Sequence, residues 1–579
     1  MSAQKRRDTA AVLRKLGWRR IAGALLRRAG SEMRAFARPG TKRQPATASG
    51  FVDALLRAPS LVAGSAPLDD PPSAPVDPAD PRLRWEAARG GRLVALASRR
   101  DAGFEAALLA FLAEPVEKDP LETALRAWNL GVAASLHGAA NLGTEATRAL
   151  ARTLVESARF VEARLEDRGL VIGSHLVGEL VALEACGIVL AGAGDEPAAW
   201  RARARSALAR EARVQVLPDG GGTEGSSGYG RFVAELWLAA LSCARAAGED
   251  PSPAMVAAAR GMLTHLTDTL PPDGGDLGIG DDDSSIVLPG ATDVASIVPL
   301  LALWPLAERP VGLRWSPVAE IVGGAAARAR WEAAREVPWR DAVVAPSFGL
   351  ALARRGSLGG DMVVLRAGPH GQSGVGGHAH NDALSVAIWL GGRRVVVDPG
   401  TGLYLGRPAW RERFRGVAAH ATVCVDGLEP SELPTTRPFA LPDNTRARIV
   451  SVDDRGGVWR CVAEHTGYLR TGVRVRREVR FERATGDIDI LDALEGSGVH
   501  RVDVSFPLTG TVTLDGATVS AGDVTLRAGS ADADKGLAWR LDQGAASPRY
   551  GMIEPATVAR RVGRVALPVT LVTHIARTR

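Results

Sequence analysis

The spacing of apolar residues changes once along this chain of 579 residues, and no other feature limits its fold as strongly. Between residues 84 and 340, apolar side chains recur three, four and seven positions apart, as in PAAWRARARSALAREARVQVL, a pattern typical of amphipathic helices. From about residue 341 the period falls to two, as in VRVRREVRFE, which is typical of half-buried strands. The chain is therefore predicted to be all-α first and all-β second.

The connections within each part indicate how its elements pack. Short Gly, Pro and Asp breaks separate the helical segments, which favours antiparallel helices arranged as a bundle, solenoid or ring. No helix is expected among the strands, so their sheets should be antiparallel and stacked as a sandwich. We expect the functional cleft to lie between the two parts.

Composition divides the chain into four segments. These are a basic N-terminal helical extension (1–64), a Pro/Asp-rich linker (65–83), a helical domain (84–340) and an antiparallel β-sandwich domain (341–579).

The positive charge of the chain belongs to its N-terminus. Residues 1–50 hold thirteen Lys and Arg against two acidic residues, and the remainder is net negative. This argues against a nucleic-acid-binding domain, which would carry its basic stripe on the folded module. In residues 1–40, apolar positions follow one helix face and arginines the other; such a helix either contacts an anionic membrane surface or packs on the body of the protein, and we favour packing.

Neither an export signal nor a membrane span is visible in the sequence. Arginine pairs interrupt the N-terminal apolar stretch, so it lacks the continuous core of a signal peptide. No run of about 18 apolar residues occurs, which argues against a transmembrane helix. These features predict a cytoplasmic or membrane-peripheral protein and leave periplasmic or secreted locations open.

Histidines gather in the predicted β part. The segment GGHAHNDALS carries His378 and His380, which an extended chain places on the same side. Asp398 ends a nearby apolar strand, and His420 follows in VAAHATVCVDG. Two imidazoles and a carboxylate on neighbouring strands could hold a tetrahedral zinc ion, with water or another residue as fourth ligand. The alternative is that these residues are hydrogen-bonded structural groups.

A second candidate cluster lies in the helical part. The glycine-dense segment DGGGTEGSSGYG places Tyr229 at a helix start beside Glu224, in a chain with only four tyrosines. Upstream, Ser174 and His175 open another helix. A phenol can move a proton only in a suitable environment, because its ordinary pKa is near 10. The alternatives are a tyrosine that anchors a loop and a histidine near a helix cap.

Taken together, these segments resemble the heparinase II/III superfamily of polysaccharide lyases. The motifs that carry the resemblance are GGHAHNDALS, VVVDPGTGLY and FRGVAAHATVCVDG, with weaker matches in DGGGTEGSSGY, SHLVGELVAL and GIGDDDSS. The resemblance implies an (α/α) toroid followed by an antiparallel β-sandwich. It also implies cleavage of an acidic polysaccharide by β-elimination at a uronic acid, in which a base removes the C5 proton and an acid protonates the leaving O4.

The resemblance assigns roles residue by residue. The catalytic set that it implies is Tyr229, His378 and His175. The implied substrate-binding set is Ser174, Glu224 and Arg415. The implied ligands of a structural zinc ion are His380, Asp398 and His420.

Two departures from the family pattern keep other functions open. Ser174 stands where the family has asparagine, and Gly230 where histidine is frequent. One alternative is therefore a polysaccharide-binding or polysaccharide-assembly protein of the same fold without turnover. Another is a glycoside hydrolase that uses Glu179 and Glu224 as acid and base. The sequence leaves the polymer, endo or exo action and the oligomeric state undecided.

Overall fold

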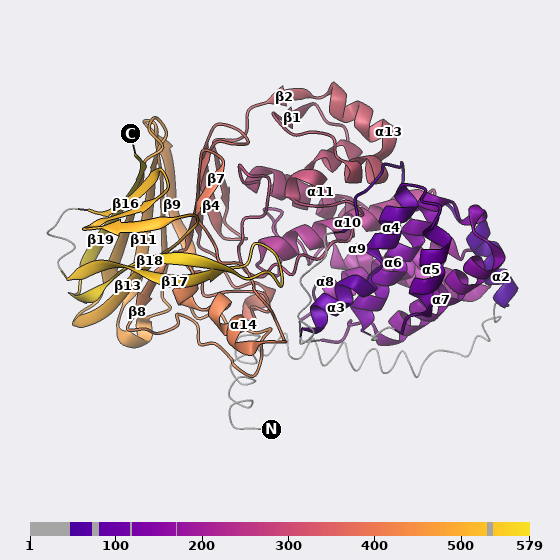
Figure 1. Cartoon of the computed structure of the whole chain (residues 1–579), viewed down its shortest axis with the longest axis horizontal. Helices are drawn as coiled ribbons and strands as arrows, with labels where there is room; N and C mark the ends of the chain where they lie inside the picture. Colours follow the sequence, from indigo (N-terminus) through magenta and orange to yellow (C-terminus); the bar gives the residue numbers. More distant parts are fainter. Residues whose placement is uncertain (1–46, 72–79, 116–118, 170, 530–535, 579) are drawn as a thin grey trace.

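The computed structural model has a helical part followed by antiparallel sheets, as the change of period predicts (Figure 1). It describes residues 47–71, 80–115, 119–169, 171–529 and 536–578. The predicted amphipathic helix in residues 1–40 lies outside the described residues.

The helical part is built from helices of 4 to 21 residues. Their bounds are α2 (Ala48–Leu56), α3 (Pro81–Ala88), α4 (Gly91–Ser98), α5 (Phe104–Ala113), α6 (Pro120–His137), α7 (Thr144–Arg164), α8 (Ser174–Val189), α9 (Asp195–Glu211), α10 (Ser227–Ala246), α11 (Pro253–Thr269), α12 (Val294–Ile297) and α13 (Pro317–Ala333).

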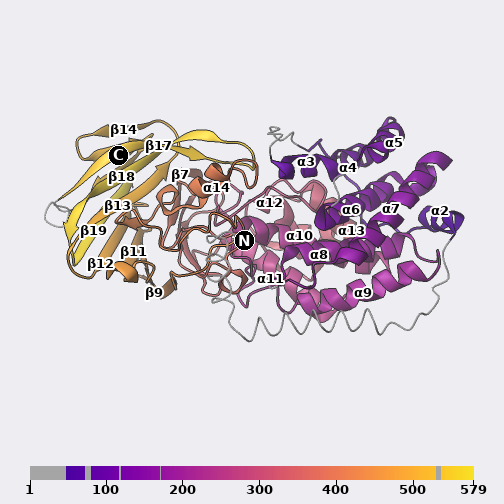
Figure 2. The same ribbon diagram turned by 90° about the horizontal axis from the view of Figure 1, so that it is seen from below.

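Burial separates these helices into an inner and an outer layer. In α8, 15 of the 16 residues are buried, whereas only 5 of the 17 residues of α9 are. Helix α8 packs against α6, α9 and α10, and α6 and α10 are likewise buried on most of their circumference. An inner set of apolar helices backed by amphipathic outer helices is the arrangement of an (α/α) toroid, and Figure 2 shows the helices gathered on one side of the molecule.

The β part consists of two large antiparallel sheets, with β8 (Val423–Val425) paired to β13 beside the second. The first sheet has the order β14 (Val512–Asp515), β15 (Thr518–Ala521), β16 (Val524–Ala528), β19 (Val569–Arg577), β12 (Ile488–Glu495), β11 (Arg474–Glu482), β10 (Val458–His465) and β9 (Arg448–Arg455). The second has the order β17 (Leu537–Ala546), β18 (Glu554–Ala566), β13 (Val499–Leu508), β7 (Arg393–Val396), β6 (Val386–Leu390), β5 (Asp361–Arg366), β4 (Leu350–Arg355) and β3 (Ala342–Ala345). Their facing apolar side chains, such as Trp459 and Phe506, form one shared core.

Two details differ from the sequence-based expectation. A short helix, α14 (Pro408–Arg415), interrupts the β part. Pro408 in its first turn suits a helix start, and the side chains of Arg411 and Arg415 are buried against hydrogen-bond acceptors. A short parallel pair, β1 (Glu308–Pro310) and β2 (Arg335–Val337), flanks α13 within the helical part.

One loop of the helical part, residues 276–285, docks onto the β part. The backbone N–H of Asp281 donates to the carbonyl of His378 at 2.9 Å. The N–H of Asp282 donates to the Thr401 hydroxyl at 2.7 Å, and the Ser284 hydroxyl accepts from the N–H of Tyr550 at 3.1 Å. The two parts therefore meet at the segments that carry the candidate site. Within the described residues, no helix is both long and apolar enough to cross a membrane.

Candidate functional site

Tyr229 lies in the first turn of α10 and faces the β part. The hydroxyl of Ser226 caps this helix by accepting from the N–H of Tyr229 at 3.1 Å, which fixes where the turn begins. The Tyr229 ring stacks on the imidazole of His378, with centroids 3.6 Å apart and planes 20° from parallel. The two candidate catalytic side chains, 149 positions apart in the sequence, are thus in direct contact.

The orientation of His378 is set by a carboxylate from the helical part. Its Nδ1 lies 3.1 Å from Oδ2 of Asp281, while Nε2 lies 3.7 Å from Oε2 of Glu224. A carboxylate at Nδ1 holds the proton there and leaves Nε2 with a lone pair, as in the aspartate–histidine pairs of hydrolases. Asp281 therefore fixes the orientation of the His378 ring, with Nε2 turned toward Glu224.

Asp281 joins several functional groups at one buried point. Besides His378, it contacts Nε2 of His380 at 2.9 Å through Oδ1. The guanidinium of Arg411 binds both of its oxygens, one of them at 2.7 Å. Burial alone would raise the pKa of Asp281, but Arg411 and the two histidines hold it well below its usual range. Asp281 is therefore a carboxylate that fixes both histidines.

Sequence reasoning passed over Tyr404, Tyr550 and Asp80. The Tyr404 hydroxyl donates to the Tyr229 hydroxyl at 3.4 Å. The Tyr550 hydroxyl binds Asp80 at 2.8 Å and also accepts from the backbone N–H of Tyr404 at 2.8 Å. Three of the four tyrosines in the chain therefore gather here. The scarcity of tyrosine was the signal that could have pointed to them.

The phenol of Tyr229 is neutral in this environment. Burial, together with the nearby charges of Asp283 and Asp281, raises its pKa well above the ordinary value, and the hydrogen bond from Tyr404 opposes this only in part. Tyr229 and His378 are 7% and 8% exposed, so the site is nearly closed to solvent. In this state Tyr229 can donate a proton.

The start of α8 approaches the site through Glu224. The N–H of Ser174 donates to Oε1 of Glu224 at 2.7 Å, and its hydroxyl lies 3.4 Å from Oε2. The same Oε2 faces His378, so Ser174, Glu224 and His378 form a continuous line of polar groups.

His175 pairs with a residue outside this line: its Nδ1 lies 3.2 Å from Oε1 of Glu166. Burial opposes protonation of His175, but the hydrogen bond with Glu166 and its charge raise the pKa of the imidazole to about 9. Its side chain is 44% exposed, which weakens the opposing effect of burial and supports the upward direction. His175 is therefore a cation at neutral pH, at the outer edge of the candidate site.

Arg415 supports a loop instead of facing the site. Its side chain is fully buried, and Nη1 donates to the carbonyls of Pro438 and Ala440 at 3.0 and 3.1 Å. These carbonyls flank Phe439, which is 41% exposed and packs edge-on against the rings of His378 and Tyr404. Direct contact between Arg415 and a substrate would need this loop to move. Phe439 is the aromatic residue that presents itself beside the reactive pair.

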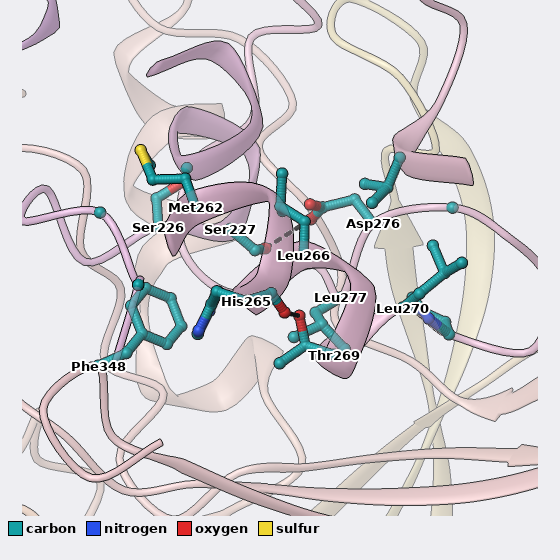
Figure 3. A pocket seen from close by; sticks show the side chains of 16 residues that line it. Ser226, Ser227, Met262, His265, Leu266, Thr269, Leu270, Asp276, Leu277 and Phe348 are labelled. Atoms are coloured by element: carbon teal, nitrogen blue, oxygen red, sulfur yellow. Dashed lines mark hydrogen bonds between the residues drawn. The ribbon is translucent and has the colours of Figure 1, made fainter. Parts of the chain in front are cut away.

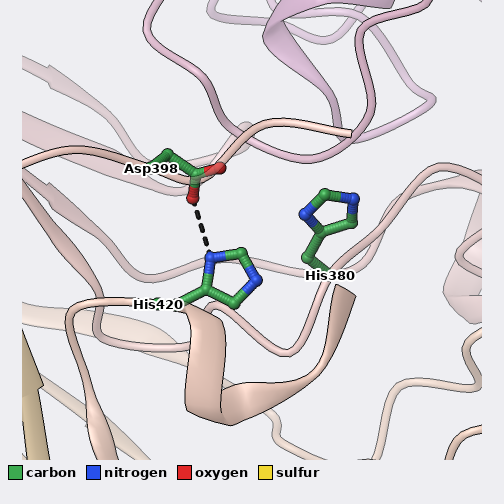
Figure 4. Close-up of side chains that lie close together, drawn as sticks. All are labelled: His380, Asp398 and His420. Atoms are coloured by element: carbon green, nitrogen blue, oxygen red, sulfur yellow. Dashed lines mark hydrogen bonds and ion pairs between the residues drawn. The ribbon is translucent and has the colours of Figure 1, made fainter. Parts of the chain in front are cut away.

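His380, Asp398 and His420 lie together and fit a metal ion. Their candidate ligand atoms are all within 4.8 Å of one another, and Figure 4 shows the three side chains converging. His420 Nδ1 lies 2.8 Å from Asp398 Oδ2, while His380 Nδ1 and His420 Nε2 are buried without a hydrogen-bond partner.

Buried imidazole nitrogens without partners are costly unless something binds them. A carboxylate behind a ligating histidine, here Asp281 behind His380, is the usual outer support of a metal site. Burial also lowers the pKa of His380, which favours the neutral form that ligates metals. The donor set suits zinc.

A small cavity beneath the start of α10 is separate from the reactive residues. Ser227, Met262, His265 and Phe348 are among its lining residues (Figure 3). Its volume of about 20 Å³ has room for a single water molecule but not for a sugar. We assign it no part in substrate binding.

The β part matches the model of a known domain family. Residues 338–573 match the family model described as "Heparinase II/III-like, C-terminal". This confirms the resemblance read from the histidine-containing motifs, which lie within the matched residues. No curated protein sequence matches the chain.

Solved structures resemble the chain over both parts. "Crystal Structure of Heparinase III" matches with a TM-score of 0.69 and 15% identity, covering 87% of this chain and 78% of that one. A heparan sulfate lyase HepC mutant from Pedobacter heparinus matches with a TM-score of 0.61 and 18% identity, covering 94% and 85%. The chondroitin AC lyase of Streptomyces coelicolor A3 matches with a TM-score of 0.53 and 14% identity, covering 92% and 79%. At these identities the likeness establishes the fold, a toroid joined to a β-sandwich.

Proposed function

We propose that this protein is a polysaccharide lyase that cleaves an acidic, uronic-acid-containing polymer by β-elimination. The observation that carries the proposal is the stacked contact between Tyr229 and His378, donated by the two parts of the molecule. The reaction needs one group to take the C5 proton and another to protonate O4, both within hydrogen-bond reach of one sugar. The proteins of similar fold are named heparinase III, heparan sulfate lyase and chondroitin AC lyase, which supports the same class of chemistry.

His378 would act as the base. Asp281 at its Nδ1 leaves Nε2 free to accept the C5 proton and then stabilises the imidazolium that forms. Tyr229 would act as the acid, because its raised pKa keeps the phenol protonated until O4 leaves. The hydroxyl of Tyr404 would orient the phenol oxygen.

The substrate carboxylate also needs a positive partner, because charge builds up on it when the C5 proton leaves. His175 is the candidate, since Glu166 raises its pKa to about 9. Ser174 and Glu224 would bind the sugar beside it as hydrogen-bond donor and acceptor. The serine reaches less far than the asparagine of the family pattern, so we expect slower turnover than in a relative with asparagine.

The contact between the two rings also bears on stereochemistry. Side chains stacked 3.6 Å apart approach a sugar from one side, which favours syn elimination. In D-glucuronate and D-mannuronate the C5 hydrogen and O4 lie on the same face of the ring. In L-iduronate, L-guluronate and D-galacturonate they lie on opposite faces. We therefore propose a polymer of D-glucuronate or D-mannuronate as the substrate.

We also propose that His380, Asp398 and His420 hold a structural zinc ion. Bound there, the metal would cross-link the segments that carry these residues. Asp281 contacts both His380 and His378, so an ordered metal site would also hold the proposed base in place.

The test is a panel of uronic polymers read by near-ultraviolet absorbance of the unsaturated product. Hyaluronan, heparosan or polymannuronate should give the signal, whereas polyguluronate and polygalacturonate should not. Tyr229→Phe should remove the signal while the protein stays folded. Retained activity in that variant would refute the assignment of the acid.

A binding protein without turnover is the second candidate, and the near-complete burial of Tyr229 and His378 favours it. It predicts binding of uronate oligomers without any unsaturated product. A hydrolase has less support: Glu179 is fully buried and accepts from the N–H of Glu166 at 2.8 Å, and Glu224 is engaged by Ser174. Saturated products with new reducing ends would point to it.

A further inference from the structure

Helix α14 separates two environments of opposite character. On one face, Arg411 is buried against the carboxylate of Asp281, and Arg415 is buried against the loop that carries Phe439. On the other face, Arg413 is exposed and Trp410 is half-buried. This outer face borders a groove of about 1100 Å³ that does not include Tyr229 or His378.

The groove runs between α14 and the ends of three strands of the second sheet. Its walls are residues 508–510 at the end of β13, 543–546 at the end of β17, and 554–557 at the start of β18. Figures 1 and 2 show α14 beside this end of the β part, near the boundary with the helices. A volume near 1000 Å³ is at the upper end of ordinary ligand pockets and accommodates several sugar units.

The lining has the chemistry of an acidic carbohydrate site. The guanidinium of Arg413 lies over the Trp410 ring, 5.1 Å from its centre, so the cation and the aromatic ring form one stacked pair in the wall of the groove. Arg407 is a second cation, and Glu554 is the one acidic residue among the lining residues, all of which lie in the described part of the chain. Gln543 adds an amide for hydroxyl groups. Arginine forks bind carboxylates and sulfates in pairs of hydrogen bonds.

One residue of the groove wall is a neighbour, along the chain, of a residue that contacts the proposed catalytic pair. Leu403 lines the groove, and the adjacent Tyr404 contacts Tyr229. A polymer held in the groove would therefore contact the segment that positions Tyr404. The chain outside residues 1–50 is net negative, which disfavours a densely charged polyanion such as nucleic acid.

We propose that this groove is an anchoring site for an acidic polysaccharide, in which a sugar packs beside the stacked pair of Trp410 and Arg413 and its carboxylate is bound by Arg413 and Arg407. The inference rests on the proposed function for the identity of the polymer, but binding in the groove needs no turnover. The anchor would hold a long chain close to the catalytic residues between cleavage events.

The experiment measures binding in a full-length Tyr229→Phe background, so that the polymer is not consumed. Affinity electrophoresis through gels that contain hyaluronan or polymannuronate gives the dissociation constant. Trp410→Ala and the double variant Arg407→Ala/Arg413→Ala should each raise it about tenfold, the usual effect of losing an interface anchor. Arg455→Ala, an exposed arginine on β9, should leave it unchanged. Thermal unfolding checks that every variant is folded.

Unchanged retardation of the folded Trp410→Ala protein, or no binding of any uronic polymer by the parent, would overturn the inference. Equal retardation by neutral pullulan would overturn the acidic specificity. If the wild-type protein gives no unsaturated product but Trp410→Ala still weakens binding, the proposed lyase activity fails while the anchoring site stands.

Discussion

The ring of Tyr229 stacks on the imidazole of His378 at a centroid distance of 3.6 Å, although one residue opens a helix of the toroid and the other lies in a turn of the β part. The contact depends on the loop 276–285, whose Asp281 binds the backbone and the side chain of the His378 segment. Packing between the two parts therefore builds the candidate site.

Replacing Asp281 should damage both stability and activity. Asp281→Asn removes the charge that Arg411 needs in a buried site, and breaking such a pair costs about 3–5 kcal/mol of unfolding free energy. Loss of the carboxylate at His378 should lower kcat on the order of 10²–10⁴-fold. Denaturant unfolding and product absorbance measure the two effects. Asp489→Asn, which breaks an exposed pair with His574, is the matched control and should change neither by much.

The metal site gives a prediction that is independent of the substrate. The purified protein should carry about one zinc ion per chain, because its three candidate ligands fit a single tetrahedral site. His380→Ala or His420→Ala should lose the metal and lower the melting temperature. Elemental analysis measures the zinc content. His574→Ala, an exposed histidine on β19, should keep the metal; equal loss from this control would argue against the site.

The pH profile should report on His175. Glu166 raises its pKa to about 9, so the imidazolium that neutralises the substrate carboxylate is present below that pH and is lost as the pH rises through it. The alkaline limb of kcat/KM should therefore lie near pH 9. Glu166→Gln removes the supporting charge and should move the limb to lower pH. An alkaline limb that does not move in Glu166→Gln would show that His175 does not neutralise the substrate carboxylate.

A buried carboxylate should make the fold less stable at alkaline pH. Burial raises the pKa of Glu179 on α8 to about 8, above the ordinary glutamate value of 4.5. The folded protein therefore binds this proton more tightly than the unfolded chain, and stability falls as the pH rises from about 4.5 to 8. Glu179→Gln should flatten this fall, as followed by melting temperature across the range. Arg455→Ala, a surface change, should keep the wild-type slope.

The sequence was sufficient for the architecture because hydrophobic period is a local property. It also brought His380, Asp398 and His420 together as candidates, since the spacing of short strands limits how far apart they can lie. It did not predict that Asp281 joins His378 to His380, because that contact spans 97 positions and depends on how the two parts dock. The acidic run at 281–283 was visible, but nothing local distinguished its first residue from the next two.

The burial of Arg415 was missed for a related reason. In sequence, Arg411, Arg413 and Arg415 are equivalent charges on one short segment. The helix of α14 separates them, turning Arg411 toward Asp281 and Arg415 toward the loop at 434–440, and leaving Arg413 in solvent.

The bond left at the cut end of the polymer tests the proposed chemistry most directly. Wild-type protein and Tyr229→Phe should be incubated with polymannuronate and with hyaluronan, and the products examined by absorbance and mass spectrometry. The account predicts fragments that carry a C4–C5 double bond from the wild type and none from the variant. Saturated fragments that have gained water, or unsaturated fragments formed equally by both proteins, would contradict it.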